Sequence, residues 1–398
     1  MKEKLKKYRK YYKQGILLRM IERKVVNITR PFWIRIMKIF PIDEKKVCFD
    51  SFEGTGFGGD PKYICLELVR CRPDLKIIWF VRKKKDDFPK GIKQICIDSI
   101  AAVYHQSTAK VWVDNTRTGH RTKKRSGQYY LQTWHGQVVS KKIEKDAEDK
   151  LWSSYIPVAK YDGSITDAVM ASNEIFEKIF RSSFWLSDKT DVLRSGSPSN
   201  DVLFLDRNKI KIRKSLGLSE NEFVLLYAPT FRDDSSVDGY IKDYSTIIEA
   251  FQKKVKKKCV VLLRYHPDIA EEMKRVNNIR DVIDVTLYPD IKDLSIVSDF
   301  IITDYSSIIS DFILLKRPGL RYCSDIAEYI KLRGMYDTFY ELPYEIVTTE
   351  GDLRNKILNF DFNGFNDKLN QFLAEFKFYD DGYASLRAVD WINKSLKE

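Results

Sequence analysis

The sequence predicts an α/β protein in which two Rossmann-like domains face one cleft and follow a basic amphipathic helical segment. Its 398 residues are enough for two domains of ordinary size. Hydrophobic residues make up 43% of the chain and aromatic residues 13%, which is ample for two buried cores. Short apolar runs alternate with amphipathic stretches in two series, a pattern typical of parallel sheets covered by helices on both faces.

Residues 1–46 differ from the rest of the chain in charge. They hold 15 Lys and Arg against 4 Asp and Glu, whereas the remaining residues hold 54 against 52. Apolar residues recur near helical spacing with cations between them, as in a helix lying in an anionic headgroup layer. The alternative is that this apolar stripe packs on the protein's own body. We expect Pro31 and Pro41 to divide the segment into two pieces.

The two series of strands define the expected domains. The N-terminal domain spans residues 47–205, with strands at 47–52, 77–81, 95–97, 111–114, 129–133, 168–171 and 192–195. The C-terminal domain spans residues 206–398 and ends in helices, with strands at 223–228, 260–264, 282–284, 300–303 and 320–323. The helices expected most clearly lie at 61–70, 173–181, 247–257, 291–297 and 307–315.

Two of the four histidines follow predicted strands, where open parallel sheets bind their ligands. His135 follows the strand at 129–133, and His266 follows the strand at 260–264. A neutral imidazole is the usual acceptor for the proton of a hydroxyl nucleophile. A single histidine is more often structural, but two at strand ends on opposite sides of a cleft favour catalysis. His105 and His120 have no such setting, and we expect them at the surface.

Hydroxyl groups and one arginine also follow strands. The strand at 300–303 runs into the segment from Asp304 to Asp311, in which the hydroxyls of Ser306 and Ser307 and the neighbouring backbone N–H groups could bind phosphate. The alternative is that these residues only cap the following helix. Thr230 and Arg232 follow the strand at 223–228, and arginine is a natural bidentate partner of phosphate. The alternative is that Arg232 forms a salt bridge at the surface.

Several absences narrow the function. The six cysteines form no C-x-x-C pair, which argues against a zinc site or disulfide framework and favours a reducing cytoplasm. There is no Asp-x-Asp, G-x-S-x-G or H-E-x-x-H motif, so we expect no metal and no cofactor. No apolar run approaches the length of a spanning helix, and no signal peptide is recognisable. The nearly neutral body argues against a nucleic-acid partner.

The motifs, taken in order, resemble the CDP-glycerol glycerophosphotransferase family, which builds teichoic acids and related capsular polysaccharides. The resemblance covers residues from about 47 to 395. It rests on the motifs at 132–136 (QTWHG), 227–232 (YAPTFR), 264–267 (RYHP) and 304–311 (DYSSIISD), with further matches at 52–54, 60–62, 316–318, 333–337 and 381–387.

The resemblance implies a GT-B-like pair of domains in which residues 47–205 form the acceptor side and residues 206–398 bind CDP-glycerol as the donor. An acceptor hydroxyl would attack the β-phosphorus, and CMP would leave. His135 and His266 are then the catalytic histidines, with His135 as the base. The remaining residues implied at the site are Thr230, Arg232, Ser306 and Ser307 around the pyrophosphate, Asp304 and Asp311 as orienting groups or glycerol ligands, and Arg333 and Arg387 as further phosphate contacts.

The resemblance also implies an acceptor and a location. We expect a lipid-linked glycan acceptor at the cytoplasmic face of the membrane, peripheral attachment through residues 1–46, and addition of a single unit. Ser199 stands where the motif normally has arginine, and residues 137–139 are also less typical, so the acceptor could differ. Three alternatives stay open: a CDP-ribitol or other CDP-alditol transferase, a GT-B glycosyltransferase using a nucleotide sugar, and a non-enzymic membrane- or nucleic-acid-binding protein.

Overall fold

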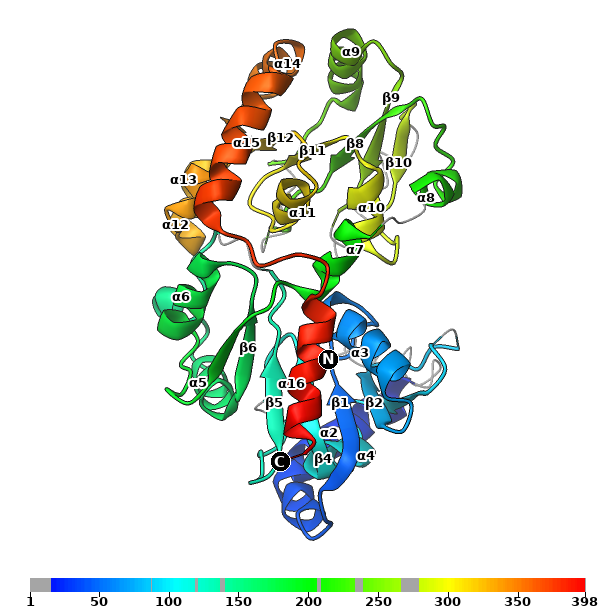
Figure 1. The fold of residues 1–398 in the computed structure, drawn as a ribbon, viewed down its shortest axis with the longest axis vertical. Coiled ribbons are helices and arrows are strands. Elements are labelled where there is room, and N and C mark those ends of the chain that lie inside the picture. The colour runs from blue at the N-terminus through cyan, green and yellow to red at the C-terminus, as the bar shows by residue number, and fades with distance from the viewer. Residues whose placement is uncertain are drawn as a thin grey trace, which may run out of the picture.

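The chain folds into two α/β domains stacked end to end, each built on one parallel sheet (Figure 1). The computed structural model describes residues 16–86, 88–118, 121–136, 140–205, 209–232, 239–265 and 279–397, and the side chains of its first helix from residue 24 onward.

The first sheet has seven strands in the order β3-β2-β1-β4-β5-β6-β7, and every neighbouring pair is parallel. The chain order reverses between β1 and β4, so the carboxyl ends of these two strands flank the crevice where such sheets bind ligands. The strands are β1 (Asp43–Phe49), β2 (Lys76–Val81), β3 (Ile92–Cys96), β4 (Ala109–Asp114), β5 (Tyr129–Gln132), β6 (Ala168–Ala171) and β7 (Asp191–Arg194).

The second sheet repeats this arrangement with six parallel strands in the order β10-β9-β8-β11-β12-β13. Its chain order reverses between β8 and β11. The strands are β8 (Phe223–Tyr227), β9 (Cys259–Leu263), β10 (Val282–Asp284), β11 (Phe300–Thr303), β12 (Gly319–Tyr322) and β13 (Ile346–Val347). The predicted pair of Rossmann-like domains is therefore confirmed, and every predicted strand is present to within a few residues.

Helices cover both faces of both sheets. They are α2 (Ile16–Met37), α3 (Gly59–Cys71), α4 (Ile100–Thr108), α5 (Ile156–Ile165), α6 (Glu174–Ser183), α7 (Asp201–Phe204), α8 (Lys209–Ser215), α9 (Tyr244–Val255), α10 (Ile291–Val297), α11 (Ile309–Leu314), α12 (Ile326–Arg333), α13 (Thr338–Glu341), α14 (Glu350–Leu358), α15 (Phe362–Phe376) and α16 (Ala384–Ser395). Two short 3₁₀ helices span Glu144–Lys150 and Pro198–Asn200.

Alternate residues of each strand serve opposite layers of core, as the two-residue period of a strand requires. In β8, Leu225 and Tyr227 join the cluster that contains α9 and α14. Val224 and Leu226 join the cluster on the other face, which contains α10, α11 and α15. Because both faces are covered, the strands read as continuous apolar runs, which is why the sequence predicts them well.

The last helix crosses back to the first domain. In Figure 1, α16 descends from the upper domain and lies along the lower sheet. Ala388, Val389 and Ile392 of α16 are buried in the same cluster as β1, β2, β4 and α3. The sequence analysis places this helix with the C-terminal domain, because its periodicity reveals a buried face without revealing which sheet it covers.

Helix α2 both packs on the body and exposes apolar side chains. Val26 and Arg30 are buried, α2 contacts α4, and Arg30 Nη1 donates to the carbonyl of Arg121 at 3.2 Å. Ile28 is 71% exposed and Phe32 58%. Each of the two interpretations of the apolar stripe therefore fits a different face of the helix.

The expected break of this helix at Pro31 is wrong. Helix α2 continues through Pro31 and ends at Met37. One proline removes a single backbone hydrogen bond, and the turns around it are held by packing against α4. In the part of the chain that the structure describes, no helix is both long and apolar enough to cross a bilayer.

Candidate active site

A cleft of about 670 Å³ lies between the two domains, at the carboxyl ends of both sheets. Its walls come from loops that follow β1, β5, β8, β9 and β11. Both points where the strand order reverses therefore open into the same space, the arrangement in which α/β proteins bind ligands. The first domain contributes Phe52, Asp60, Tyr63, His135, Gly136 and Lys141, and the second contributes Thr230, Arg264, Asp290, Lys292, Ser306, Ser307 and Asp311.

The ring of His135 lies at the wall of this cleft with a defined tautomer. Its Nδ1 is 2.7 Å from the carbonyl oxygen of Asn115. A carbonyl only accepts hydrogen bonds, so Nδ1 carries the hydrogen and Nε2 keeps an open lone pair. Desolvation by the surrounding protein lowers the pKa of His135, although the hydrogen bond to Asn115 opposes this. The neutral ring is thus ready to accept a proton near pH 7.

A strained residue turns His135 out of its strand. Trp134 has a φ of 59°, a left-handed conformation that bulky residues rarely adopt. Two contacts hold it there. Its backbone N–H donates to Oε1 of Gln132 at 2.8 Å, and its indole packs edge-on against Phe184 with ring centroids 4.8 Å apart. Strain of this kind is characteristic of functional sites, where it fixes the direction of the next side chain.

Asn115, the partner of His135, directly follows β4, and its side chain is held by two residues of the loop after β1. Its Oδ1 accepts from the backbone N–H of Phe52 at 2.8 Å, and its Nδ2 donates to Ser51 Oγ at 3.4 Å. Phe52 has a φ of 47°, so the loop after β1 is also turned sharply at this point. Asn115 thereby connects the loops after β1 and β4 to the histidine after β5.

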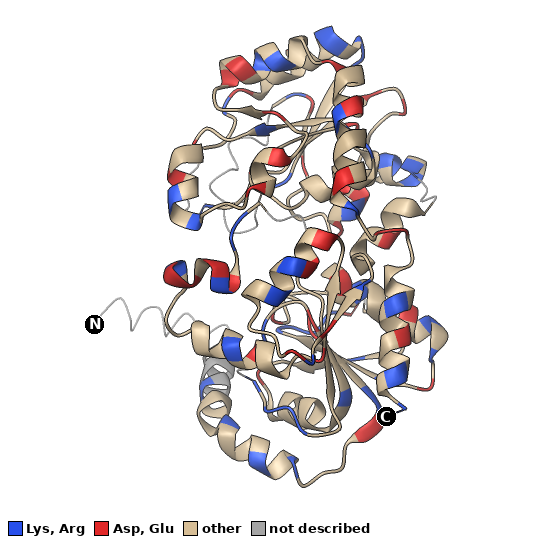
Figure 2. Cartoon of the chain, turned by 60° about the vertical axis from the view of Figure 1, so that its left-hand side comes forward, with Lys and Arg blue, Asp and Glu red and all other residues tan. Residues whose placement is uncertain are grey.

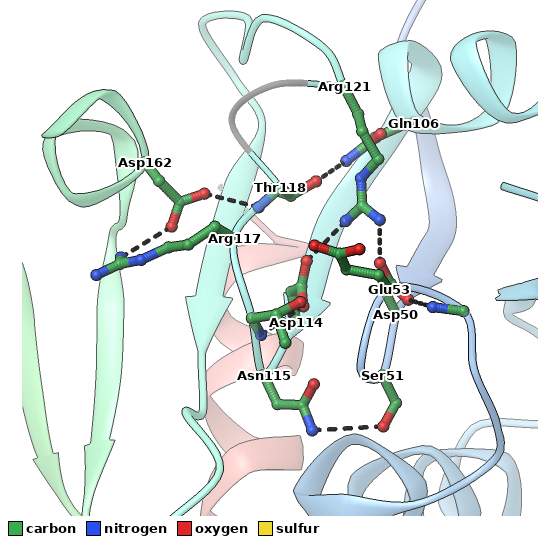
Figure 3. A network of polar contacts seen from close by, with 12 residues as sticks. Asp50, Ser51, Glu53, Gln106, Asp114, Asn115, Arg117, Thr118, Arg121 and Asp162 are labelled. Atoms are coloured by element: carbon green, nitrogen blue, oxygen red, sulfur yellow. Dashed lines mark hydrogen bonds and ion pairs between the residues drawn. The ribbon is translucent and has the colours of Figure 1, made fainter. Parts of the chain in front are cut away.

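Behind Asn115 lies a buried network of ion pairs (Figure 3). Arg121 pairs with Asp50 and, at 2.8 Å, with Asp114. Nearby, Arg117 pairs with Asp162 at 3.1 Å. Burial raises the pKa of Asp114 to about 7, and the neighbouring charge of Asp50 adds to the effect. One guanidinium thus serves two carboxylates at the carboxyl ends of β1 and β4.

Across the cleft, the loop after β11 approaches His135 closely. A Cβ atom added at Gly136 would lie 3.0 Å from Ser307 Oγ, so a larger residue at this position would press on the side chain of Ser307. Ser306 and Ser307 both line the cleft, as predicted. Thr230 also lines it, and both its N–H (2.8 Å) and its hydroxyl (2.6 Å) donate to Asp304 Oδ1. The structure therefore brings three of the predicted hydroxyl residues to one wall.

Arg232 and Asp304 stand behind that wall instead of in it. Both are buried, and Arg232 Nη1 pairs with Asp304 at 2.9 Å while its Nε pairs with Asp325 at 2.6 Å. Neither residue lines the cleft. Arg232 therefore has two carboxylate partners behind the wall, and it is buried, whereas the alternative to phosphate binding placed its salt bridge at the surface. Asp304 accepts from Thr230 and so orients it.

Asp311 lines the cleft, paired with a lysine that sequence reasoning missed. Lys292 Nζ lies 2.6 Å from Asp311 Oδ1 and 2.6 Å from Oδ1 of Asn200. Asp60 was also missed; it accepts from Ser197 Oγ at 2.7 Å and from the N–H of Ser199 at 2.8 Å. Asp60 belongs to the motif at 60–62 that the sequence analysis noted without assigning it a role. Lys292 belongs to none of the motifs noted there, and its partners Asp311 and Asn200 are far from it in the sequence.

The two remaining predicted arginines, Arg333 and Arg387, lie in different places. Arg333 lines a smaller pocket of about 320 Å³ that adjoins the cleft at His135 and Gly136. Arg387 lines neither space. It pairs with Asp381 and donates to the carbonyl of Ser195 at 3.0 Å, so it ties α16 to the segment between the domains. The predicted contact of Arg387 with phosphate is therefore not supported by its position.

Three predicted features lie outside the residues that the structure describes. They are His266, His120 and residues 137–139. His105, which we expected at the surface, is half-buried beside Tyr104, and burial lowers its pKa to about 4. Among the residues that the structure describes, no group of three or more His, Cys, Asp or Glu side chains could hold a metal ion.

The chain is similar to known proteins over most of its length. The sequence profile of CDP-Glycerol:Poly(glycerophosphate) glycerophosphotransferase matches residues 33–394. The chain is 32% identical over 372 residues to a teichoic acid poly(glycerol phosphate) polymerase of Staphylococcus epidermidis, covering 90% of this chain but only 52% of the relative. It is 31% identical over 366 residues to a teichoic acid glycerol-phosphate transferase of Staphylococcus aureus, covering 87% of this chain and 92% of the relative.

A solved structure is similar over almost the whole chain. It is that of the wall teichoic acid polymerase TagF, a histidine-to-asparagine variant soaked with CDPG. The TM-score is 0.83 at 30% sequence identity, and the match covers 96% of this chain and 97% of that one. The chain thus spans about half of one curated relative and nearly all of the other relative and of this structure.

The buried carboxylates beside Asn115 should give stability a specific dependence on pH. Native Asp114 takes up its proton near pH 7, whereas an unfolded aspartate does so near about 4. The native state therefore binds more protons between these values, and the free energy of unfolding falls as pH rises through them. Asp114→Asn removes this titration, so its stability relative to wild type should improve from pH 4.5 to 7.5, measured by urea unfolding.

The matched control is Asp390→Asn, which changes an exposed residue of α16. Its unfolding free energy should run parallel to that of the wild type. A pH dependence that is the same in Asp114→Asn and in wild type would contradict the assignment.

Proposed function

The chain belongs to the CDP-glycerol:poly(glycerophosphate) glycerophosphotransferase family, a family of transferases of teichoic acid biosynthesis, and on that premise we propose its reaction. The enzyme moves glycerol phosphate from CDP-glycerol to a hydroxyl group of an acceptor and releases CMP. The observation that carries the proposal is the position of His135, which has a fixed tautomer and faces the loop of Ser306 and Ser307.

We propose His135 as the general base. Its Nε2 accepts the proton of the acceptor hydroxyl while the oxygen attacks the β-phosphorus of CDP-glycerol. A new bond forms between phosphorus and the acceptor oxygen, and the bond from this phosphorus to the bridging oxygen breaks. CMP departs with the electron pair of that bond. The hydrogen bond from Nδ1 to Asn115 keeps Nε2 pointed at the nucleophile and supports the positive charge that the ring gains.

We propose that the opposite wall holds the donor's pyrophosphate. Ser306, Ser307 and Thr230 supply hydroxyl groups there, and Lys292 supplies a cation close by. His266 belongs to this set as a proposal, from its place directly after the β9 strand and Tyr265. Phosphoryl transfer needs mainly positioning and stabilisation of charge, so donors fixed by a buried scaffold suit it. Arg232 and Asp304 supply that scaffold by holding Thr230.

We propose that residues 1–46 attach the enzyme to an anionic membrane surface on the cytoplasmic side. Val25, Ile28 and Phe32 are exposed and follow helical spacing on α2, and Lys24, Arg35 and Lys38 flank them. Figure 2 shows Lys and Arg, in blue, along the described part of this helix. Such cations contribute about 1 kcal/mol each near an anionic leaflet. This location suits a lipid-linked glycan acceptor. We also propose addition of a single unit, because the Staphylococcus aureus relative is named a glycerol-phosphate transferase and not a polymerase.

The roles of the two walls predict opposite effects of substitution. His135→Ala should lower the rate of CMP release at least about 100-fold, because a general base contributes ~10²–10⁴-fold. Its affinity for CDP-glycerol, measured by calorimetry, should stay within a few-fold of wild type. Ser306→Ala and Ser307→Ala should instead weaken donor binding.

Because the pKa of His135 is depressed, the wild-type rate should fall only when pH drops below the ordinary histidine range.

Circular dichroism and melting temperature show whether each variant is folded. A large loss of donor affinity in His135→Ala would overturn its assignment to the acceptor side. Unchanged donor affinity in both serine variants would remove their proposed role.

The membrane proposal predicts that the exposed face of α2 binds lipid. Ile28→Ser/Phe32→Ser should reduce co-sedimentation with phosphatidylglycerol-containing vesicles at least about fivefold and leave affinity for CDP-glycerol unchanged, because the buried face with Val26 and Arg30 is untouched. Ile210→Ser, at an equally exposed apolar residue of α8, is the matched control and should bind vesicles like wild type. Equal vesicle binding by all three proteins would contradict attachment through α2.

A further inference from the structure

Arg117 contacts the residue that precedes the proposed base, although it lines neither the cleft nor the adjoining pocket of about 320 Å³. The centre of its guanidinium lies 5.5 Å from the ring centroid of Trp134 and 5.0 Å from that of Phe184. The residue is only 4% exposed. A guanidinium attracts an aromatic ring more strongly away from water. Arg117 therefore holds the indole of Trp134, whose strained backbone turns His135 out of its strand.

Two buried carboxylates fix the guanidinium in this position. Its Nη2 lies 2.6 Å from Glu144 and its Nη1 lies 3.1 Å from Asp162, and Figure 3 shows the side chain extended toward Asp162. Glu144 also accepts from the hydroxyl of Tyr155 at 2.6 Å. Pairing at both ends of a planar guanidinium fixes its orientation as well as its position. The place of the guanidinium is thus set by α5 and by the segment after His135.

The same contacts also hold the hydrogen-bond partner of His135. Asn115, whose carbonyl accepts from Nδ1 of this ring, lies two residues before Arg117. The backbone N–H of Thr118 donates to Oδ1 of Asp162 at 2.9 Å, while Oδ2 of the same carboxylate binds Arg117 (Figure 3). Asp162 therefore fixes the chain just after Asn115, and Arg117 fixes the chain just before His135. Both ends of the hydrogen bond that sets the tautomer depend on these contacts.

The backbone is strained on both sides of His135. Trp134 has a φ of 59° and Glu144 a φ of 52°, left-handed conformations that residues other than glycine rarely adopt. Such conformations persist only where the surrounding structure holds them, and they are characteristic of functional sites. Arg117 contacts both strained residues. It is therefore placed to hold the segment that carries His135 in one direction.

We propose that Arg117 is a positioning residue, which sets the direction and the tautomer of His135 through Trp134 and the segment of Asn115. The inference rests on the proposed function, in which His135 is the base, and it goes beyond that function by naming the group that holds the base. In this role Arg117 touches no substrate. Its planar shape matters as well as its charge, because lysine cannot pair with two carboxylates and stack on an indole in the same geometry.

The first test observes the imidazole directly and needs no substrate. In the full-length protein labelled with ¹⁵N-histidine, chemical shifts near neutral pH report which ring nitrogen carries the hydrogen, and the signals lost in His135→Ala are those of His135. Wild type should show hydrogen on Nδ1 and a free lone pair on Nε2. Arg117→Lys should shift these signals toward a mixture of the two tautomers. Unchanged His135 signals in a folded Arg117→Lys variant would overturn the proposal.

Arg213→Lys is the matched control, because Arg213 is an arginine of the second domain that is buried to the same extent. Its guanidinium donates to the backbone carbonyls of Ser219 at 2.7 Å and Val297 at 3.2 Å, and it lies outside the lining of the cleft. The control should lower the melting temperature, as Arg117→Lys does, without changing the tautomer of His135. The same change of tautomer in both variants would reflect general loosening of the fold and would overturn the proposal.

The second test separates rate from binding. Arg117→Lys should lower the rate of CMP release at saturating CDP-glycerol at least about tenfold, because small displacements of a catalytic group are costly. Its affinity for CDP-glycerol, measured by calorimetry, should stay within a few-fold of wild type, and Arg213→Lys should match wild type in both. An unchanged rate would contradict the proposal. No CMP release by wild type would count against the proposed function alone, because the NMR comparison still decides the role of Arg117.

Glu144→Gln provides a third test, because it keeps an oxygen for Arg117 but removes a negative charge near His135. Burial lowers the pKa of His135, the hydrogen bond to Asn115 and the charge of Glu144 raise it, and Arg117 and Lys141 lower it. The other charged residues around the ring are Lys142, Lys150 and Arg333 in the small pocket, and Asp60, Arg264, Asp290, Lys292 and Asp311 in the cleft.

Glu144→Gln should therefore leave the tautomer of His135 as in wild type and move the acid limb of the rate profile to lower pH. A variant that merely loosened the site would admit water, weaken the effect of burial and move the acid limb to higher pH. Movement to higher pH, no movement, or a change of tautomer would each contradict the account. This variant also keeps the proposal open to disproof if Arg117→Lys does not fold, which circular dichroism would show.

Discussion

The hydrogen bond between His135 Nδ1 and the carbonyl of Asn115 is the contact on which the site depends. It sets the tautomer of the proposed base, and it requires that the loops after β4 and β5 meet at a fixed distance. Asn115 is held by the loop after β1, and the ion pairs of Arg121 with Asp50 and Asp114 lie directly behind it. The buried charges of the first sheet therefore act on function through the direction of one imidazole lone pair.

The second constraint is the relation between the two domains, because the cleft exists only where their loops meet. The chain crosses between the domains near residues 196–205 and again near 377–383, and these crossings are bonded together. Asp380 accepts from the N–H of Ser197 at 2.9 Å, and Asp201 accepts from the N–H groups of Ala384 and Ser385 at 2.8 and 2.7 Å. Helix α16 then anchors the return in the core of the first sheet. The spacing between His135 and Ser307 is thus maintained from behind the cleft.

The sequence predicts the sheets well because buried parallel strands are continuous apolar runs. Strand β13 was not predicted, because it has only two residues. It also places His135, Thr230, Ser306 and Ser307 directly after strands, and all four line the cleft. It fails where the identity of a partner decides the role. Arg232 is a residue of the type that binds phosphate, but its guanidinium pairs with Asp304 and Asp325. The partners of Lys292 and Asp60 can be recognised only once the two domains are placed together. Such pairings are long-range, so no local pattern encodes them.

The cleft is proposed to bind CDP-glycerol as the donor. This is tested most directly by calorimetric titration of the protein with CDP-glycerol, CDP-ribitol and a UDP-sugar in parallel. We expect saturable binding of CDP-glycerol with at least tenfold preference over the other two. A preference for CDP-ribitol would contradict the proposed donor but keep the geometry of transfer. Binding of the UDP-sugar alone would contradict both the donor and the proposed reaction.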